Sequence, residues 1–145
     1  MKQFEVISVN ISEKVGVVKK PIPAIQLKVD HGVIGDAHAK NWHRQVSLLA
    51  TEDIDIMRKK FETLKPGDFA ENITTKGIEL FTLPIGTKLS IGEVELEVTQ
   101  IGKKCHKGCA ILKQVGDCIM PRRGIFTKVI KGGEINNEST GTYDI

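Results

Sequence analysis

The cysteines of this chain are gathered in one short, basic segment. Residues 103–126 read KKCHKGCAILKQVGDCIMPRRGIF and include all three cysteines, Cys105, Cys109 and Cys118. Eight basic residues and one acid give residues 103–131 a net charge of +7, which leaves −4 for the rest of a chain whose net charge is +3. This asymmetry indicates either an anionic partner or a solvated basic face. Nucleic acid is poorly supported as the partner, because the segment has one aromatic residue and no binding motif.

Four explanations of these cysteines are open: a metal site, a disulfide, a reactive sulfur and an inert buried loop. The three cysteines and His106 would suit zinc, but paired CxxC knuckles are missing. A disulfide is disfavoured in a reducing compartment, and the many cations disfavour an inert buried loop. Neighbouring cations stabilise the thiolate, which is both the nucleophile and the soft metal ligand. Cys105, which follows Lys103 and Lys104 and precedes Lys107, is therefore the candidate reactive thiol.

A second cluster, HGVIGDAHAKNWHRQVSLL, contains three of the four histidines and the only tryptophan. Gly32 and Gly35 permit backbone conformations that would bring Asp36 and His38 into a cleft. The alternative is a polar turn in which Asp36 satisfies backbone donors and the histidines are exposed.

A third cluster, PGDFAENI, places Glu71 and Asn72 within a short apolar stretch. The amide of an asparagine in such a place either satisfies loop backbone or holds the edge of a ligand, because it offers both donors and an acceptor.

The elements that must position these residues are mostly strands. Residues 94–98 alternate strictly between apolar and polar side chains and follow a tight turn at Gly92-Glu93, which predicts a hairpin. A phase change near Val6-Ile7 predicts a bulge in the first strand. The predicted strands are 4–11, 24–30, 77–83, 94–98 and 124–130.

One helix is predicted over about residues 51–63, with Thr51 as its cap and Pro66-Gly67 as its stop. Ile54, Met57, Phe61 and Leu64 repeat at helical spacing and predict a core-facing stripe. Many short strands with one helix indicate a mainly β protein with a closed, barrel-like fold.

Length and composition predict a single domain over residues 1–145, with a polar, loosely held C-terminal tail from about 136. The N-terminus has no apolar core typical of a signal peptide, and no stretch reaches the ~18 apolar residues of a membrane span. An odd number of cysteines argues against a secreted disulfide framework. We therefore expect a cytoplasmic protein.

In sequential order, GVIGDAHA, WHRQVSLL and PGDFAENITTKGIELFTLPIGTKLSIGEVELEVTQIGKKC resemble the MOSC domain, the C-terminal module of molybdenum cofactor sulfurases, which also occurs as small standalone bacterial proteins. The similarity covers roughly residues 4–135. It implies a mostly β, barrel-like fold whose signature cysteine follows the strand that ends the hairpin, here Cys105. Many members have an arginine and a proline before that cysteine, where this chain has Lys103-Lys104.

The resemblance also implies a site. Cys105 would carry sulfur as a persulfide or ligate molybdenum, or tungsten, in a bound pterin cofactor. The residues matching the Gly-Asp-His turn and the Glu-Asn element would shape its pocket: Gly35, Asp36, His38, Glu71 and Asn72. The guanidinium groups of Arg122 and Arg123 would hold the cofactor phosphate.

The resemblance therefore implies a sulfur carrier, in which Cys109 or Cys118 would resolve the Cys105 persulfide by forming a disulfide. A cysteine desulfurase would be the donor, and molybdenum-cofactor biosynthesis proteins or molybdoenzymes would be the acceptors; pyridoxal phosphate is not expected on this domain. The alternatives are a molybdenum-cofactor-dependent reductase of N-hydroxylated compounds, a non-catalytic cofactor carrier, and a structural zinc module.

Overall fold

The computed structural model describes residues 2–15, 17–59, 62–102 and 123–144. Within them the fold is mainly β, with one α-helix. The elements are β1 (Lys2–Ile11), β2 (Lys20–Ile22), β3 (Ala24–Lys28), β4 (Gly32–Val33), β5 (Val46–Ala50), α1 (Thr51–Arg58), β6 (Ile73–Lys76), the 3₁₀ helix η1 (Leu80–Thr82), β7 (Lys88–Ile91), β8 (Val94–Ile101), β9 (Ile125–Lys131), β10 (Gly133–Asn136) and β11 (Thr140–Tyr143). No helix in the described part has the length and apolar character needed to cross a membrane.

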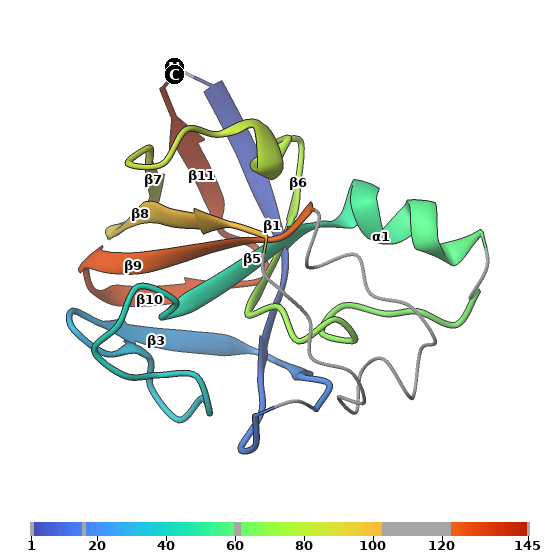
Figure 1. The fold of residues 1–145 in the computed structure, drawn as a ribbon, viewed down its shortest axis with the longest axis horizontal. Coiled ribbons are helices and arrows are strands. Elements are labelled where there is room, and N and C mark those ends of the chain that lie inside the picture. The colour runs from blue at the N-terminus through green and yellow to red at the C-terminus, as the bar shows by residue number, and fades with distance from the viewer. Residues whose placement is uncertain (1, 16, 60–61, 103–122, 145) are drawn as a thin grey trace.

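The larger sheet closes into a barrel. Its strand order is β11-β7-β8-β9-β5-β6-β1-β2, and β11 also pairs with β1, so seven strands form the closed ring and β2 lies at its edge. Figure 1 shows β11 and β1 side by side where the two chain ends meet. Closure pairs the edge strands with each other and leaves their backbone groups satisfied. The predicted closed, barrel-like fold is confirmed.

A smaller sheet, β10-β3-β4, packs against the barrel (Figure 1). Its Ile25, Leu27, Val33 and Ile135 belong to the same buried cluster as the barrel interior. The barrel and the small sheet therefore share one core.

Strand β5 is buried on both faces. Val46, Leu48 and Ala50 point into the barrel core, whereas Leu49 packs into a second cluster with α1 and with Phe126 of β9. A strand covered on both sides is mostly apolar on both faces, and here Ser47 is the polar exception. VSLLA therefore has no apolar–polar alternation, and β5 was not among the predicted strands.

The predicted hairpin and bulge are confirmed. Val94, Leu96 and Val98 are buried on one face of β8, and Ile91 pairs with Val94 across the turn. The β1–β6 register shifts between Val6 and Ser8, as a bulge requires.

The predicted helix is too long. Helix α1 ends at Arg58, and its N-cap is Ala50, which makes no side-chain capping bond, so Thr51 is not the cap. Leu64 is buried in the second cluster, and its carbonyl accepts a 3.0 Å bond from Arg58 Nε. Leu64 therefore matches the helical spacing of apolar residues although it lies beyond the end of α1, which explains why the predicted helix was too long.

The predicted strand at 77–83 is also wrong. Ile78 and Leu80 are buried, which imitates a strand pattern, but the chain turns at Leu80–Thr82 and the Leu83 amide donates to the Leu80 carbonyl over 3.1 Å.

The C-terminal residues are not loosely held. Strand β11 pairs with both β1 and β7 and completes the barrel. The polar sequence of β11 gives no sign of this role. At its centre Gly141 packs directly against the buried ring of Phe4, and a Cβ on Gly141 would lie 2.2 Å from that ring.

Replacement of Gly141 by alanine should therefore destabilise the fold by about 1–3 kcal/mol, because the Phe4 ring must leave its position in a closely packed core. Denaturant unfolding measures the change. Thr140→Ala, on the exposed part of the same strand, should cost far less. In Phe4→Leu the Gly141→Ala penalty should shrink. Equal penalties in both backgrounds would contradict the proposed clash.

Candidate functional site

The Gly-Asp-His turn follows β4 of the small sheet and contacts Ser12, which lies just after β1. Gly35 adopts φ +89°, which favours glycine, and the next amide, that of Asp36, donates to the Val33 carbonyl over 3.2 Å. The Asp36 carboxylate accepts bonds from the backbone amides of Ser12, at 3.0 Å, and His38, at 3.2 Å. The structure thus brings Asp36 and His38 together, and Asp36 also satisfies backbone donors.

Lys19, which sequence reasoning missed, is the centre of this cluster. Its side chain is fully buried, and Nζ lies 2.7 Å from Asp36 Oδ1, 3.1 Å from Ser12 Oγ and 3.1 Å from His38 Nδ1. An ammonium group can only donate, so His38 Nδ1 accepts and the ring hydrogen lies on Nε2. The sequence shows only two adjacent lysines, and nothing in it says that Lys19 points inward and Lys20 outward.

The surroundings of Asp36 keep it ionised. Burial alone would raise its pKa, but the charge of Lys19 and the hydrogen bonds from Lys19, Ser12 and Asn72 outweigh that effect and hold the pKa below its ordinary value. The pair is therefore a fixed, nearly neutral unit inside the fold.

Asn72 joins three strands of the barrel. Its Oδ1 accepts from the Ser47 amide over 3.1 Å, its Nδ2 donates to the Asn10 carbonyl over 3.2 Å, and its carbonyl accepts from the Asn10 amide over 2.8 Å. These bonds connect β1, β5 and the start of β6. In the structure, the side chain of Asn72 therefore satisfies backbone groups of the neighbouring strands.

Glu71 is fully buried beside it. One oxygen, Oε2, accepts from the Gly67 amide over 3.0 Å and from Thr74 Oγ1 over 2.8 Å, whereas Oε1 has no hydrogen-bond partner. Burial raises the pKa of Glu71 to about 7, although the bonds from Gly67 and Thr74 oppose the rise.

A narrow cleft opens beside His38 on the outer face of β5. It is lined by His38, Arg44, Ser47, Phe69, Ala70, Asn72 and Phe126. Its interior of about 10 Å³ has room for about one water-sized oxygen atom. Trp42 fixes the loop above it, because its indole Nε1 donates to the His38 carbonyl over 2.9 Å.

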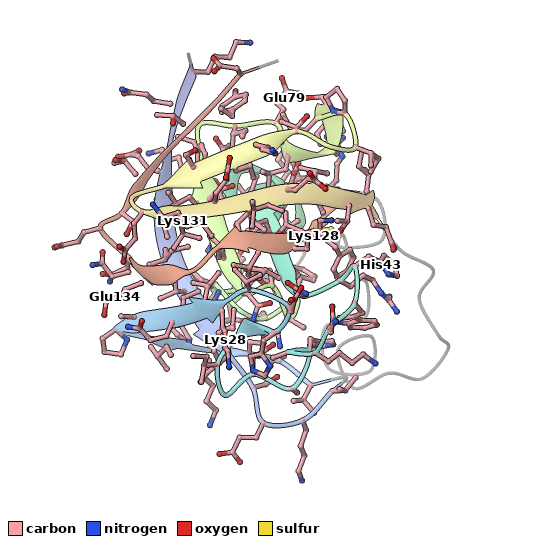
Figure 2. The ribbon with its side chains drawn as sticks, turned by 90° about the vertical axis from the view of Figure 1, so that its left-hand side faces the viewer. Lys28, His43, Glu79, Lys128, Lys131 and Glu134 are labelled. Atoms are coloured by element: carbon pink, nitrogen blue, oxygen red, sulfur yellow. The ribbon has the colours of Figure 1, made fainter. Side chains whose placement is uncertain are left out.

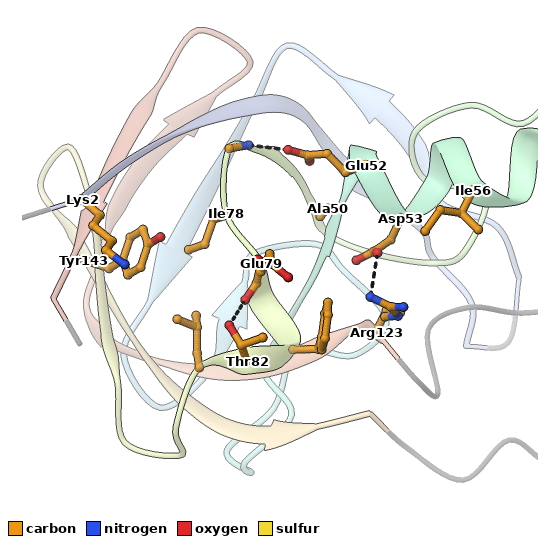
Figure 3. Close-up of a pocket in the computed structure, with 13 residues that line it drawn as sticks. Lys2, Ala50, Glu52, Asp53, Ile56, Ile78, Glu79, Thr82, Arg123 and Tyr143 are labelled. Atoms are coloured by element: carbon orange, nitrogen blue, oxygen red, sulfur yellow. Dashed lines mark hydrogen bonds and ion pairs between the residues drawn. The ribbon is translucent and has the colours of Figure 1, made fainter.

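Arg123 lies in a different cavity. This cavity of about 440 Å³ is lined by α1, η1 and the chain ends, and Figure 3 shows Arg123 facing Asp53 in it. The guanidinium lies 3.6 Å from Asp53 Oδ1 and 4.2 Å from the ring centre of Phe81. Burial raises the pKa of Asp53, Arg123 lowers it and nearby acids raise it again, with a net rise. The structure does not bring Arg123 to the Asp36–His38 cluster.

Two other cations of the basic region lie on the outer face of β9. Lys128 and Lys131 are labelled along that strand in Figure 2, and Lys128 Nζ is 3.5 Å from Glu97 Oε2 on β8. Part of the local positive charge is therefore balanced across the sheet.

The remaining predicted site residues, Cys105, Cys109, Cys118 and Arg122, lie outside the described residues. The structure does fix where their segment leaves and rejoins the barrel, because the Gly102 amide donates to the Gly124 carbonyl over 2.7 Å. Within the described ranges no group of three His, Cys, Asp or Glu residues is arranged to hold a metal ion.

The geometry of the cleft limits what it can hold. Asp36 and Asn72 spend their polar atoms on internal bonds, and the interior admits about one oxygen atom. The described residues of the cleft thus fit one atom of a ligand and not a whole pterin.

A closed seven-strand barrel with a cysteine-bearing insertion between β8 and β9 is the class of structure that these elements define. The family model of the MOSC domain matches residues 35–140. The chain belongs to the MOSC domain family, which is associated with molybdenum cofactor sulfurase-like proteins. The resemblance seen in the sequence is confirmed.

Solved structures share this fold. The YuaD protein from Bacillus subtilis is 16% identical, with a TM-score of 0.80 over 97% of this chain and 94% of that one. YiiM from Geobacillus stearothermophilus is 16% identical, with a TM-score of 0.73 over 98% and 75%. YiiM from Escherichia coli is 18% identical, with a TM-score of 0.72 over 100% and 71%. At these identities the similarity shows the fold alone. No curated protein matches the sequence.

Replacement of Lys19 by methionine should destabilise the fold by about 3–5 kcal/mol at pH 7, because Asp36 would remain buried without its counter-ion. In the native protein the pKa of Asp36 is below its ordinary value, so its stabilising effect is present above about pH 4 and is lost as pH falls through the folded pKa. The gap between the two proteins should therefore narrow in acid. Urea unfolding from pH 3 to 7 measures it, with exposed Lys20→Met as the matched control.

A second prediction concerns Glu71. Its folded pKa of about 7 is above its ordinary 4.5, so protonation stabilises the fold, and stability should fall as pH rises from about 4.5 to about 7. The loss should approach about 3 kcal/mol, at roughly 1.4 kcal/mol per unit of pKa. Glu71→Gln cannot ionise and should lack this loss. Parallel unfolding profiles for the two proteins from pH 4 to 8 would show that Glu71 does not titrate there.

Proposed function

We propose that this protein carries sulfur on Cys105 in molybdenum-cofactor-related metabolism. A cysteine desulfurase would supply the sulfur, and molybdenum-cofactor biosynthesis proteins or molybdoenzymes would accept it. The observation that carries the proposal is the place of Cys105 in the chain of a MOSC family member, three residues after Gly102, which is bonded to Gly124 where β8 and β9 meet.

Local charge supports this role. Lys103, Lys104 and Lys107 surround Cys105 in the sequence, and nearby cations favour the thiolate. A low-pKa thiolate is the form that attacks sulfane sulfur. The basic segment also suits docking onto an acidic partner surface, with Arg122 as a group that would hold an anion.

The sulfur steps balance without an external oxidant. The Cys105 thiolate attacks the terminal sulfur of the donor persulfide, a new S–S bond forms, and the donor cysteine leaves as a thiolate that takes the proton. Attack by Cys109 or Cys118 on the Cys105 sulfur would then form a disulfide and release hydrosulfide. Delivery to an acceptor thiolate is the first step run with the roles exchanged.

The Cys105 thiolate is also suited to ligating the metal of a molybdenum pterin cofactor, which would supply two-electron redox chemistry when bound. Asp36 would then act through His38, which it helps to position at the cleft. Because the described cleft fits one ligand atom, we place sulfur carriage first and cofactor ligation second.

Incubation of the protein with a cysteine desulfurase and cysteine should add about 32 Da to Cys105, the mass of one sulfur atom carried as a persulfide. Mass spectrometry of peptides prepared without reductant locates the adduct. Cys105→Ser should abolish it. The single variants Cys109→Ser and Cys118→Ser should retain it, and should prolong its lifetime where that cysteine is the resolving one.

Elemental analysis of protein purified without added metal accompanies this experiment. Stoichiometric molybdenum or tungsten that disappears in Cys105→Ser would favour cofactor ligation, and turnover of an N-hydroxylated substrate would then separate a reductase from a carrier. Stoichiometric zinc lost in Cys109→Ser would favour a zinc module. A persulfide that is absent from Cys105, or equally abundant on all three cysteines, would refute sulfur carriage by Cys105.

A further inference from the structure

Arg44 is held in an unusual setting beside the cleft. Its guanidinium carbon lies 4.6 Å from the ring centre of Trp42 and 5.7 Å from that of Phe126. Lys40 Nζ lies 4.0 Å from the same Trp42 ring. Stacking of this kind fixes the plane of a guanidinium while leaving its N–H groups to other partners.

One of those N–H groups has no partner. Arg44 Nε is buried and makes no hydrogen bond. Buried donors are almost always satisfied, so an unsatisfied one on a charged group calls for an explanation. The cleft that Arg44 lines has room for about one oxygen atom.

The other walls of the cleft suit an anionic oxygen. His38 lines it, and its Nδ1 lies 3.1 Å from the buried Lys19 ammonium. Asp36, the acid bonded within this cluster, is matched by Lys19 at 2.7 Å. Among the described residues that line the cleft, Arg44 carries the formal charge, and that charge is positive.

We propose that Arg44 binds one oxygen of a small oxyanion at this cleft. The oxygen enters beside Arg44 and Phe126, which line the cleft, and the rest of the phosphate or carboxylate group lies at the mouth. The observed cleft and the unsatisfied Nε of Arg44 carry this inference, and it does not depend on Cys105.

The inference also revises the expected source of anion binding. Arg123 already pairs with Asp53 in the separate cavity, and its guanidinium rests on Phe81. Arg44 has a comparable aromatic support but an unused donor. Of these two arginines, Arg44 is the better placed for a ligand.

Nitrogen-15 NMR can test the site directly, because the chain has four arginines and hence at most four Arg Nε–H signals. Inorganic phosphate should shift the Arg44 signal saturably, whereas chloride at equal ionic strength should not. A parallel titration with acetate distinguishes the sources, since a carboxylate site should bind acetate at least as well as phosphate. Arg44→Gln assigns the signal and should weaken binding about tenfold or more.

Arg44→Lys keeps the charge but removes the stacked Nε–H, and it should also weaken phosphate binding, measured by the phosphate-dependent rise in melting temperature. Arg58→Gln, whose guanidinium pairs with Asp55, is the matched control and should bind as the native protein does. Cys105→Ser should bind phosphate normally, so failure of the sulfur-carrier proposal would leave this one standing. An unshifted Arg44 signal, or equal phosphate stabilisation in both Arg44 variants and the native protein, would overturn it.

Discussion

The buried contact between Lys19 and Asp36 joins the two polar motifs of the chain. The Lys19 ammonium holds the Gly-Asp-His turn through Asp36 and His38. The backbone of the same residue bonds to Gly67, whose amide in turn donates to Glu71. A Cβ on Gly67 would lie 2.2 Å from the Lys19 carbonyl oxygen, so the loop before β6 must pass here as glycine. Loss of the Lys19 contacts would therefore loosen both the Gly-Asp-His turn and the loop that leads to Glu71.

Two carboxyl groups of this region have opposite environments. Asp36 faces a lysine and several donors, and its pKa is held below the ordinary value. Glu71 has donors on one oxygen only, and burial raises its pKa to about 7. Asp36 is therefore held as a charged counter-ion, whereas burial favours the neutral form of Glu71. Both groups adjoin the cleft, because Asp36 bonds to His38 and Glu71 lies between Ala70 and Asn72 in the chain, and His38, Ala70 and Asn72 all line it.

Sequence reasoning succeeded where a single strand face or a glycine turn decides the structure. The alternation of Val94, Leu96 and Val98 required one buried face, and Gly35 allowed the turn that brings Asp36 to His38. The prediction failed where a segment is buried by elements distant in sequence, because the local amino-acid pattern does not reveal such packing. Strand β5 is covered on both faces, and the polar β11 is held by pairing with β1 and β7.

The site shows the same limit. Lys19 and Lys20 are the same residue type at adjacent positions, yet Lys19 is buried and Lys20 is exposed. Arg44 was passed over because its significance lies in two aromatic rings, one of them 82 positions away in Phe126. Arg122 and Arg123 drew attention through their nearness to the cysteines in sequence, but the fold turns Arg123 toward Asp53.

The start of β9 connects the two functional regions. Arg123 lines the larger cavity and Phe126, three residues later, lines the cleft beside His38. Three residues of chain span at most roughly 10 Å, so both sites lie near the point where Gly102 bonds to Gly124. Phe126 pairs with Ser47 of β5, the strand that Asn72 ties to β1 and β6. The barrel thus fixes the cleft through the backbone pairing of β5 and β9.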